Sequence, residues 1–247
     1  SLGLLFFATV AFDEEVDLLV EMGCSSIKIA SGDVNHHPLI KKAAETGMCI
    51  QLDTGNSTLG EIEEAVDICR GEKNEKIVIH QCPSGYPARL ESINLNIIRT
   101  LQEMFPYPVA CSDHTPGRDM DIAVIAMGAQ LVEKTITLNK MTPSVEHVMS
   151  LEPGEMKEFV ETIRALAVAF GSSRRLMDEA EARKRQLVRR SVHLDETGVK
   201  GQKLSELSFS YRRPGYGIGP DEISQYKDRR LSRAIAKGGI VMPSDVL

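Results

Sequence analysis

The chain has 247 residues, of which 42% are hydrophobic, so it is long enough to bury a large core, and its formal net charge is −6. The negative charge argues against a nucleic-acid-binding surface, and no apolar run approaches the roughly 20 residues of a membrane helix, so we expect neither nucleic acid nor a membrane as a partner. The five cysteines lack CxxC spacing, which indicates reduced thiols in the core of a cytoplasmic protein rather than a disulfide framework or a zinc site.

Short β-rich runs alternate with amphipathic helical patterns up to about residue 170. The first residues have no basic region and no small-residue cleavage site, so we expect no signal peptide and a chain that begins inside a fold. The helical pattern TLGEIEEAVDICRG has a Thr suited to capping the N-terminus and Glu in its first turn. The sequence predicts strands at 4–12, 26–33, 48–55, 76–82, 109–115 and 131–137.

Alternation of strands and helices predicts parallel strands covered by helices, either in an open doubly wound sheet or in a (β/α)8 TIM barrel. No GxGxxG follows an early strand, which weakens the dinucleotide-binding form of the open sheet. Nearly every predicted strand ends in polar residues, and polar strand ends that meet on one face are typical of a barrel active site. We therefore predict that 1–170 form a partial barrel from which the first two βα units are absent, because only six of its eight strands can be found.

Some polar residues in these strands allow more specific expectations. Lys28 lies inside an apolar strand, where an unpaired ammonium group is costly, so we expect an anionic partner. Glu133 and Lys134 are adjacent and point to opposite faces of a strand, so we expect Glu133 to face the site and Lys134 to be structural. For His80 and His114, the residues alone leave a structural and a functional role open.

The composition changes after residue 170. Residues 171–187 form a charged helical pattern, which we interpret as a linker; as an unbroken helix it would span about 25 Å. Residues 188–247 are rich in Gly and in short β-like runs, so we predict a separate, small, β-rich domain there.

The motifs IKIASGD, LDTGNSTLGEIEEAV, SGYPARLESINL, SDHTPG, EKTITL and MSLEP occur in this order along the chain. They closely resemble the sialic acid synthases, a family that includes the N-acetylneuraminate, legionaminate and pseudaminate synthases and the spore-coat polysaccharide protein SpsE. The tail segments RRPGYGI and RRLSRAIAKGGIV resemble the C-terminal antifreeze-like (SAF) domain of these enzymes. The family's first two barrel strands have no counterpart here, so the resemblance implies a fragment that is inactive alone.

The family joins phosphoenolpyruvate to the aldehyde of an N-acetylated hexosamine, which gives a nine-carbon 2-keto sugar and phosphate. The resemblance implies that Lys28, Ser31 and Ser112 bind the phosphate and carboxylate of phosphoenolpyruvate. It likewise implies that Asp33 and Tyr86 bind the sugar.

The resemblance also implies a divalent metal, Mn²⁺ or Mg²⁺, that polarises the aldehyde, with His114 as a ligand. Glu133 and Glu146 match acidic positions around the metal and the attacking water, which makes them the candidate catalytic residues together with Lys28.

Two positions depart from the family pattern. Thr135 stands where the family usually has a second metal-binding histidine, and Thr is a poor ligand for a divalent metal. Asp53 stands at a substrate-binding position where the family commonly has Ser, and a carboxylate repels phosphate unless a cation lies between them. Thr135 and the missing first strands support one alternative, a non-catalytic sugar-phosphate-binding or inactive member of the family. A second alternative, a different metal-dependent barrel enzyme such as an aldolase, is disfavoured by the order of the motifs and by the SAF-like tail.

In the family, an Arg of the tail domain reaches into the sugar site of the partner subunit. Arg213, in RRPGYG, matches it. The resemblance therefore implies a homodimer with exchanged tails.

Overall fold

The computed structural model describes residues 4–247, which divide into two compact units with the boundary between Phe170 and Gly171. Each unit has its own hydrophobic core. Residues 1–3, with which the predicted first domain begins, lie outside the described residues. None of the helices in the described part of the chain is both long and apolar enough to cross a membrane.

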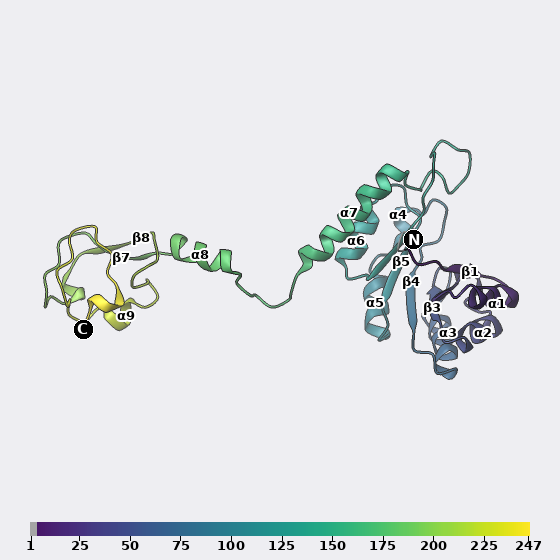
Figure 1. The fold of residues 1–247 in the computed structure, drawn as a ribbon, viewed down its shortest axis with the longest axis horizontal. Coiled ribbons are helices and arrows are strands. Elements are labelled where there is room, and N and C mark those ends of the chain that lie inside the picture. The colour runs from purple at the N-terminus through teal and green to yellow at the C-terminus, as the bar shows by residue number, and fades with distance from the viewer. Residues whose placement is uncertain (1–3) are drawn as a thin grey trace. The chain divides into compact units, whose positions relative to one another are not determined.

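The first unit alternates strands with helices, as the sequence predicts (Figure 1). All six predicted strands are present, and each is shorter than predicted; in β2, β3, β5 and β6 the largely polar segment at the carboxyl end leaves the sheet. The strands are β1 (Ala8–Val10), β2 (Ser26–Ile29), β3 (Cys49–Asp53), β4 (Ile77–Gln81), β5 (Val109–Asp113) and β6 (Leu131–Lys134). The helices are α1 (Asp13–Glu21), the 3-10 turn η1 (Ser31–Asp33), α2 (His37–Glu45), α3 (Leu59–Gly71), α4 (Leu90–Ile93), α5 (Ile97–Met104), α6 (Asp119–Ala126) and α7 (Pro153–Phe170).

The six strands form one curled parallel sheet in the order β1-β2-β3-β4-β5-β6, so each strand pairs with its neighbour in the sequence. This is the α/β half-barrel part of the predicted architecture. Among residues 4–247, β1 and β6 are the two edges of the sheet. Because all strands run in one direction, their carboxyl ends lie along the same edge.

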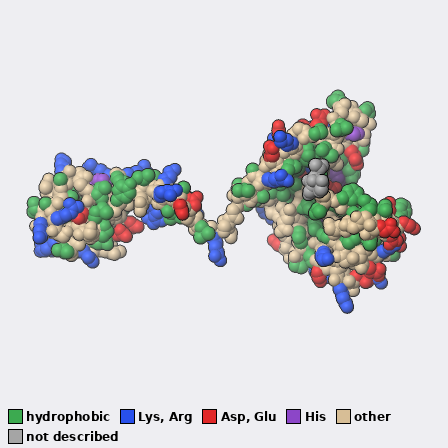
Figure 2. Space-filling model, viewed as in Figure 1, with side chains coloured by type: hydrophobic (Ala, Val, Ile, Leu, Met, Phe, Trp, Pro, Cys, Tyr) green, Lys and Arg blue, Asp and Glu red, His purple; other side chains and the backbone are tan. Residues whose placement is uncertain are grey.

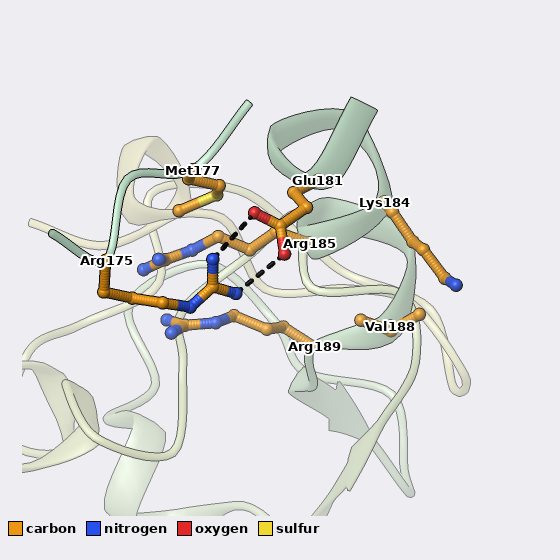
Figure 3. A pocket seen from close by; sticks show the side chains of 7 residues that line it. All are labelled: Arg175, Met177, Glu181, Lys184, Arg185, Val188 and Arg189. Carbon is orange, nitrogen blue, oxygen red and sulfur yellow. Dashed lines mark hydrogen bonds and ion pairs between the residues drawn. The ribbon is translucent and has the colours of Figure 1, made fainter. Parts of the chain in front are cut away.

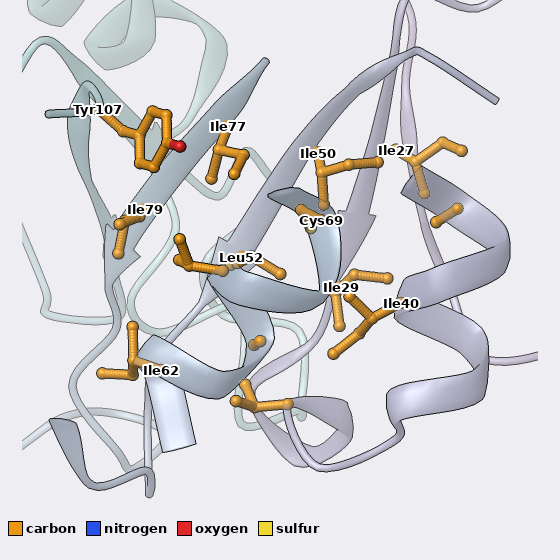
Figure 4. Close-up of a cluster of buried hydrophobic side chains, with 14 of the residues drawn as sticks. Ile27, Ile29, Ile40, Ile50, Leu52, Ile62, Cys69, Ile77, Ile79 and Tyr107 are labelled. Atoms are coloured by element: carbon orange, nitrogen blue, oxygen red, sulfur yellow. The ribbon is translucent and has the colours of Figure 1, made fainter. Parts of the chain in front are cut away.

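The outer face of the sheet is apolar and packs against helices. Ile and Leu residues alternate along β2, β3 and β4 on this face and contact α2 and α3 (Figure 4). Each fully buried side chain of this size contributes about 1.5–3 kcal/mol relative to its exposed state. Since side chains alternate along a strand, the intervening residues point to the inner face. These intervening residues are Lys28, Gln51, Asp53, His80, Ser112 and Glu133.

A buried charge cluster joins the ends of β5 and β6 to α6. The Lys134 ammonium group donates to the Asp113 carboxylate and to the Thr115 carbonyl oxygen (2.6 Å), and lies 3.3 Å from Asp121 Oδ2. The backbone N–H of Thr115 donates to Asp113 Oδ1 (3.2 Å). Lys134 thus lies on the opposite face from Glu133, as predicted, and fixes the segment that contains His114.

We expect Lys134→Met to lower the free energy of unfolding by about 3–5 kcal/mol at pH 7.5, because it leaves two buried carboxylates without their cation. Burial and the Asp113 carboxylate raise the pKa of Asp121 from 3.8 to about 7. Folding therefore takes up a proton between these values, and stability falls as the pH rises through this range. The loss caused by Lys134→Met should accordingly be smaller at pH 5 than at pH 7.5.

Urea unfolding followed by circular dichroism at the two pH values measures these differences. Lys157→Met removes an exposed lysine of α7 and should change stability by less than about 0.5 kcal/mol. A loss of similar size in both variants would show that the cluster contributes nothing specific.

The second unit is built around a two-stranded antiparallel sheet. Its elements are α8 (Glu179–Val188), β7 (Ser191–Leu194), η2 (Leu204–Glu206), β8 (Phe209–Arg212), α9 (Ile223–Tyr226) and η3 (Pro243–Asp245). Apolar residues from the strands and the long loops form its core, and Arg233 makes a bidentate ion pair with Asp245 (2.6 and 3.0 Å).

The charged helical pattern at 171–187 is helical only in its second part. Helix α7 ends at Phe170, and α8 begins only at Glu179, where Asp178 caps it by accepting a hydrogen bond from the Glu181 N–H (2.7 Å). The side chains of α8 are largely exposed, and Lys and Arg side chains stand out over it in Figure 2. The α8 segment is therefore a short solvated helix.

Candidate active site

Lys28 lies at the centre of a buried ionic cluster on the inner face of the sheet. Its Nζ lies 2.9 Å from Asp53 Oδ2 and donates a short hydrogen bond to Glu133 Oε2. The side chain of Lys28 is 5% exposed, whereas that of Glu133 is 38% exposed. The predicted anionic partner of Lys28 thus consists of two carboxylates from β3 and β6, one of which reaches solvent.

Burial and charge oppose each other in this cluster. Burial acts to lower the pKa of Lys28, but attraction to Asp53 and Glu133 outweighs it and raises the pKa, so the amine stays protonated. Burial raises the pKa of Asp53 to about 6, although Lys28 acts in the opposite direction. Asp53 is therefore the group of the cluster closest to taking up a proton near neutral pH.

Two further polar residues continue the cluster across the sheet. His80 pairs in register with Asp53 on the neighbouring strand, and its Nδ1 lies 3.8 Å from Asp53 Oδ1. Its Nε2 lies 2.9 Å from Gln51 Oε1. Gln51 was not among the predicted site residues. The signal for it was the period-two spacing from Gln51 to Asp53, which places both on the inner face.

His114 and Tyr86 come together beyond the end of β5. Their ring centroids are 4.3 Å apart, and His114 Nδ1 lies 3.4 Å from the Pro83 carbonyl oxygen. Burial lowers the pKa of His114, so its imidazole is neutral at pH 7. Tyr86 is half exposed, whereas Ser112 is buried on the inner face and pairs in register with Glu133. This arrangement places an aromatic surface, a neutral imidazole and a hydroxyl at the same edge of the sheet.

Ser31 lies in the turn η1 after β2, next to Gly55 after β3. A Cβ at Gly55 would lie 3.3 Å from Ser31 Oγ and 2.7 Å from the Cys82 carbonyl oxygen, so no larger residue fits there. Asp33 closes the same turn and is half-buried. The predicted site residues of β2, β3, β5 and β6 therefore lie in the last residues of these strands or directly after them, at one edge of the sheet.

The structure does not bring every predicted residue into this cluster. Glu146 is exposed in the loop between β6 and α7, and His147 in the same loop pairs with Thr137 Oγ1 (2.6 Å). Thr135 Oγ1 is buried without a hydrogen-bond partner among residues 4–247. Within the same residues, no three His, Cys, Asp or Glu side chains are placed to hold a metal ion. The residues described here do not form a complete metal site.

Arg213 belongs to the second unit, where its Nε donates to the Val188 carbonyl oxygen (2.7 Å). That unit also has a cavity of about 540 Å³ beside α8 (Figure 3). Arg175 and Glu181 form a bidentate ion pair at its wall (3.0 and 2.7 Å). A smaller cavity, of about 210 Å³, lies at the carboxyl ends of β3 and β4, where Thr54, Gly55 and Cys82 contribute to its lining.

Comparison with known proteins agrees with the resemblance seen in the motifs. A model of the NeuB family matches residues 1–175. The N,N'-diacetyllegionaminic acid synthase of Legionella pneumophila is 34% identical over 242 residues, which cover 96% of this chain and 68% of that protein. The N-acetylneuraminate-9-phosphate synthase of Mus musculus is 31% identical over 249 residues, covering 100% and 69%.

A solved structure, the N-acetylneuraminic acid synthetase of Leptospira borgpetersenii in complex with citrate, has a TM-score of 0.69 and 29% identity. The match covers 74% of this chain and 64% of that one. The chain spans 64–69% of the length of these relatives. The chain belongs to the NeuB family.

Proposed function

We propose that the protein condenses phosphoenolpyruvate with an N-acetylated hexosamine, such as an N-acetylmannosamine-like sugar, to form a nine-carbon 2-keto sugar and phosphate. The ionic cluster of Lys28, Asp53 and Glu133 on the inner face carries the proposal, because it combines a cation for the substrate anion with a solvent-accessible carboxylate. Relatives such as those of Legionella pneumophila and Mus musculus are named synthases, which disfavours the non-catalytic alternative.

The reaction forms a bond between C3 of phosphoenolpyruvate and the aldehyde carbon, adds water at C2 and breaks the bond from C2 to the phosphate oxygen. Lys28 supplies a charge-assisted donor to the phosphate or carboxylate, with Ser31 and Ser112 as further donors. Glu133 is placed to accept a proton from the attacking water, because it reaches solvent while its other contact is Lys28. Asp33 and Tyr86 supply an acceptor and a surface for the sugar.

We expect Glu133→Gln to lower kcat by about 10²–10⁴-fold, the contribution typical of a general base, with a smaller change in KM. Phosphate release from phosphoenolpyruvate by the full-length protein, with a panel of N-acetylated hexosamines, measures this. The matched control is Glu161→Gln on the exposed side of α7, which should retain the wild-type rate. If the protein binds a sugar of the panel but releases phosphate with none of them, it is a binding protein and not a synthase.

The proposed metal is Mn²⁺ or Mg²⁺ at His114, and no step above depends on it. Bound there, the ion would polarise the aldehyde oxygen. With Thr135 in place of an imidazole, oxygen atoms must supply the remaining ligands, and an oxygen-rich site favours Mg²⁺ or Mn²⁺ over Zn²⁺.

Titration followed by the paramagnetic resonance of free Mn²⁺ should therefore show weak binding that His114→Ala abolishes. Thr135→His adds a second imidazole and should tighten the binding. Unchanged affinity in both variants would remove His114 and Thr135 from any metal site.

The tail at 188–247 is proposed to be the SAF-like domain, joined through 171–187 to the barrel part. We propose that Arg213 serves the sugar site of a partner subunit in a homodimer with exchanged tails, since its guanidinium fork suits hydroxyl and carboxylate groups. The exposure of Arg213 within its own unit supports this role.

A mixture of inactive Lys28→Ala and inactive Arg213→Ala proteins should then recover activity, because one of the two sites in a mixed dimer contains both residues. Each mixed dimer should have up to about half the activity of a wild-type dimer. Subunit exchange is verified with differently tagged proteins. An inactive mixture after verified exchange would place Arg213 at its own subunit's site or outside any site.

A further inference from the structure

A line of buried polar side chains crosses the inner face from Ser26 to Lys28 by way of three residues on neighbouring strands. Gln51 Nε2 donates to Ser26 Oγ (2.6 Å), and Gln51 Oε1 lies 2.9 Å from His80 Nε2. His80 then faces Asp53, which pairs with Lys28. All five residues are less than 9% exposed, so the line is shielded from solvent.

The contact with Gln51 determines which nitrogen of His80 carries hydrogen. Gln51 uses its amide hydrogen on Ser26 and presents its oxygen to His80, so His80 Nε2 must be the donor. Burial and the nearby Lys28 lower the pKa of His80 to about 4, so the ring is neutral at pH 7. Nδ1 therefore carries a lone pair and can only accept.

This lone pair faces another acceptor. His80 Nδ1 and Asp53 Oδ1 lie 3.8 Å apart, and neither atom has a hydrogen-bond partner among residues 4–247. Two buried acceptors without a donor are costly. One proton on Asp53 would remove this cost: once the two atoms close from 3.8 Å to hydrogen-bond distance, its O–H donates to His80 Nδ1 while the other oxygen still accepts from Lys28.

Anion binding at Lys28 would add to an existing excess of negative charge, since Lys28 already carries two carboxylate partners. We propose that Asp53 and His80 form a proton-accepting pair that takes up one proton when a substrate anion binds at Lys28. The proton comes from solvent and reduces the negative charge beside the anion by one unit. With phosphoenolpyruvate as the anion, this inference rests on the proposed function.

Other groups also face Asp53. Lys28 and Glu133 lie within the cluster, Cys82 follows β4, and Tyr86 lies in the loop beyond it. The charge of Asp53 helps to raise the pKa of both Cys82, to about 12, and Tyr86, after burial as the main cause, so both stay protonated near neutral pH. His80 is thus the acceptor placed to stabilise a protonated Asp53.

The test uses sulfate, which does not titrate near neutral pH, as a probe of anion binding by the full-length protein. Uptake of one proton makes the Kd rise tenfold per pH unit above the pKa of Asp53 in the free protein, which is about 6. Calorimetry between pH 6 and pH 8 should therefore show a Kd that weakens up to about 50-fold, with a buffer-dependent enthalpy.

Asp53→Asn has nearly the same shape and mimics the protonated acid, because its amide can donate to His80 Nδ1. This variant should bind sulfate at pH 8 about as tightly as the wild type does at pH 6, without pH dependence. Asp17→Asn, at an exposed ion pair with Lys42, is the control and should titrate like the wild type. His80→Phe removes the acceptor and should shift the pH-dependent range to lower pH.

Infrared difference spectra give an independent readout. Sulfate should produce the C=O stretch of a carboxylic acid in the wild type and in Asp17→Asn, and not in Asp53→Asn. Three results would each overturn the inference. They are proton uptake that persists in Asp53→Asn, sulfate binding by the wild type that does not depend on pH, and sulfate binding that is absent or is unaffected by Lys28→Ala. Proton-linked sulfate binding without any sugar condensation would contradict the proposed function alone. Sugar condensation without proton-linked sulfate binding would contradict the inference alone.

Discussion

One ammonium group shared by two carboxylates organises the inner face of this protein. Lys28, Asp53 and Glu133 come from three strands that are not all neighbours, so their meeting depends on the curl and register of the whole sheet. Removing Lys28 would leave the buried Asp53 carboxylate without its cation, at a cost of about 3–5 kcal/mol. The cluster therefore constrains the fold at the same place where it provides chemistry.

The two faces of the same strands serve different purposes, and alternation of side chains keeps them separate. Ile27, Ile50 and Ile79 pack outward against helices and supply the apolar burial on which stability depends. Their neighbours in the sequence point inward and carry charge or hydrogen-bonding groups. Glu133 and Lys134 show the division most directly, because two adjacent residues belong to two ionic clusters on opposite faces. A register shift of one residue would exchange these faces and bury both charges in the wrong environment.

The sequence alone predicts the alternation of strands and helices, because hydrophobic periodicity is a local property. It also predicts that Lys28 needs an anion and that Glu133 and Lys134 diverge. It does not predict which anion, since Asp53 and Glu133 approach Lys28 only through the three-dimensional curl of the sheet. The charged segment 171–187 is helical only in part for a local reason that composition obscures: Asp178 is a strong N-cap, so the helix begins after it and the preceding residues stay outside it. Gln51 was missed because an amide in an apolar strand looks unremarkable until its partner on the next strand is known.

The two departures from the family pattern act on the same balance of charge. Thr135, directly after β6, supplies a hydroxyl in place of an imidazole, so this position offers no nitrogen that could bind a cation, and Asp53 adds a carboxylate beside Lys28. With both changes, the inner face attracts an anion less strongly than a face with the residues usual in the family would. A proton from solvent is a positive charge that this face can take up, and the facing acceptors of Asp53 and His80 are the two atoms that would share it. The Gln51 contact makes this possible, because it turns the lone pair of His80 toward Asp53 and leaves the acid hydrogen a single direction in which to donate.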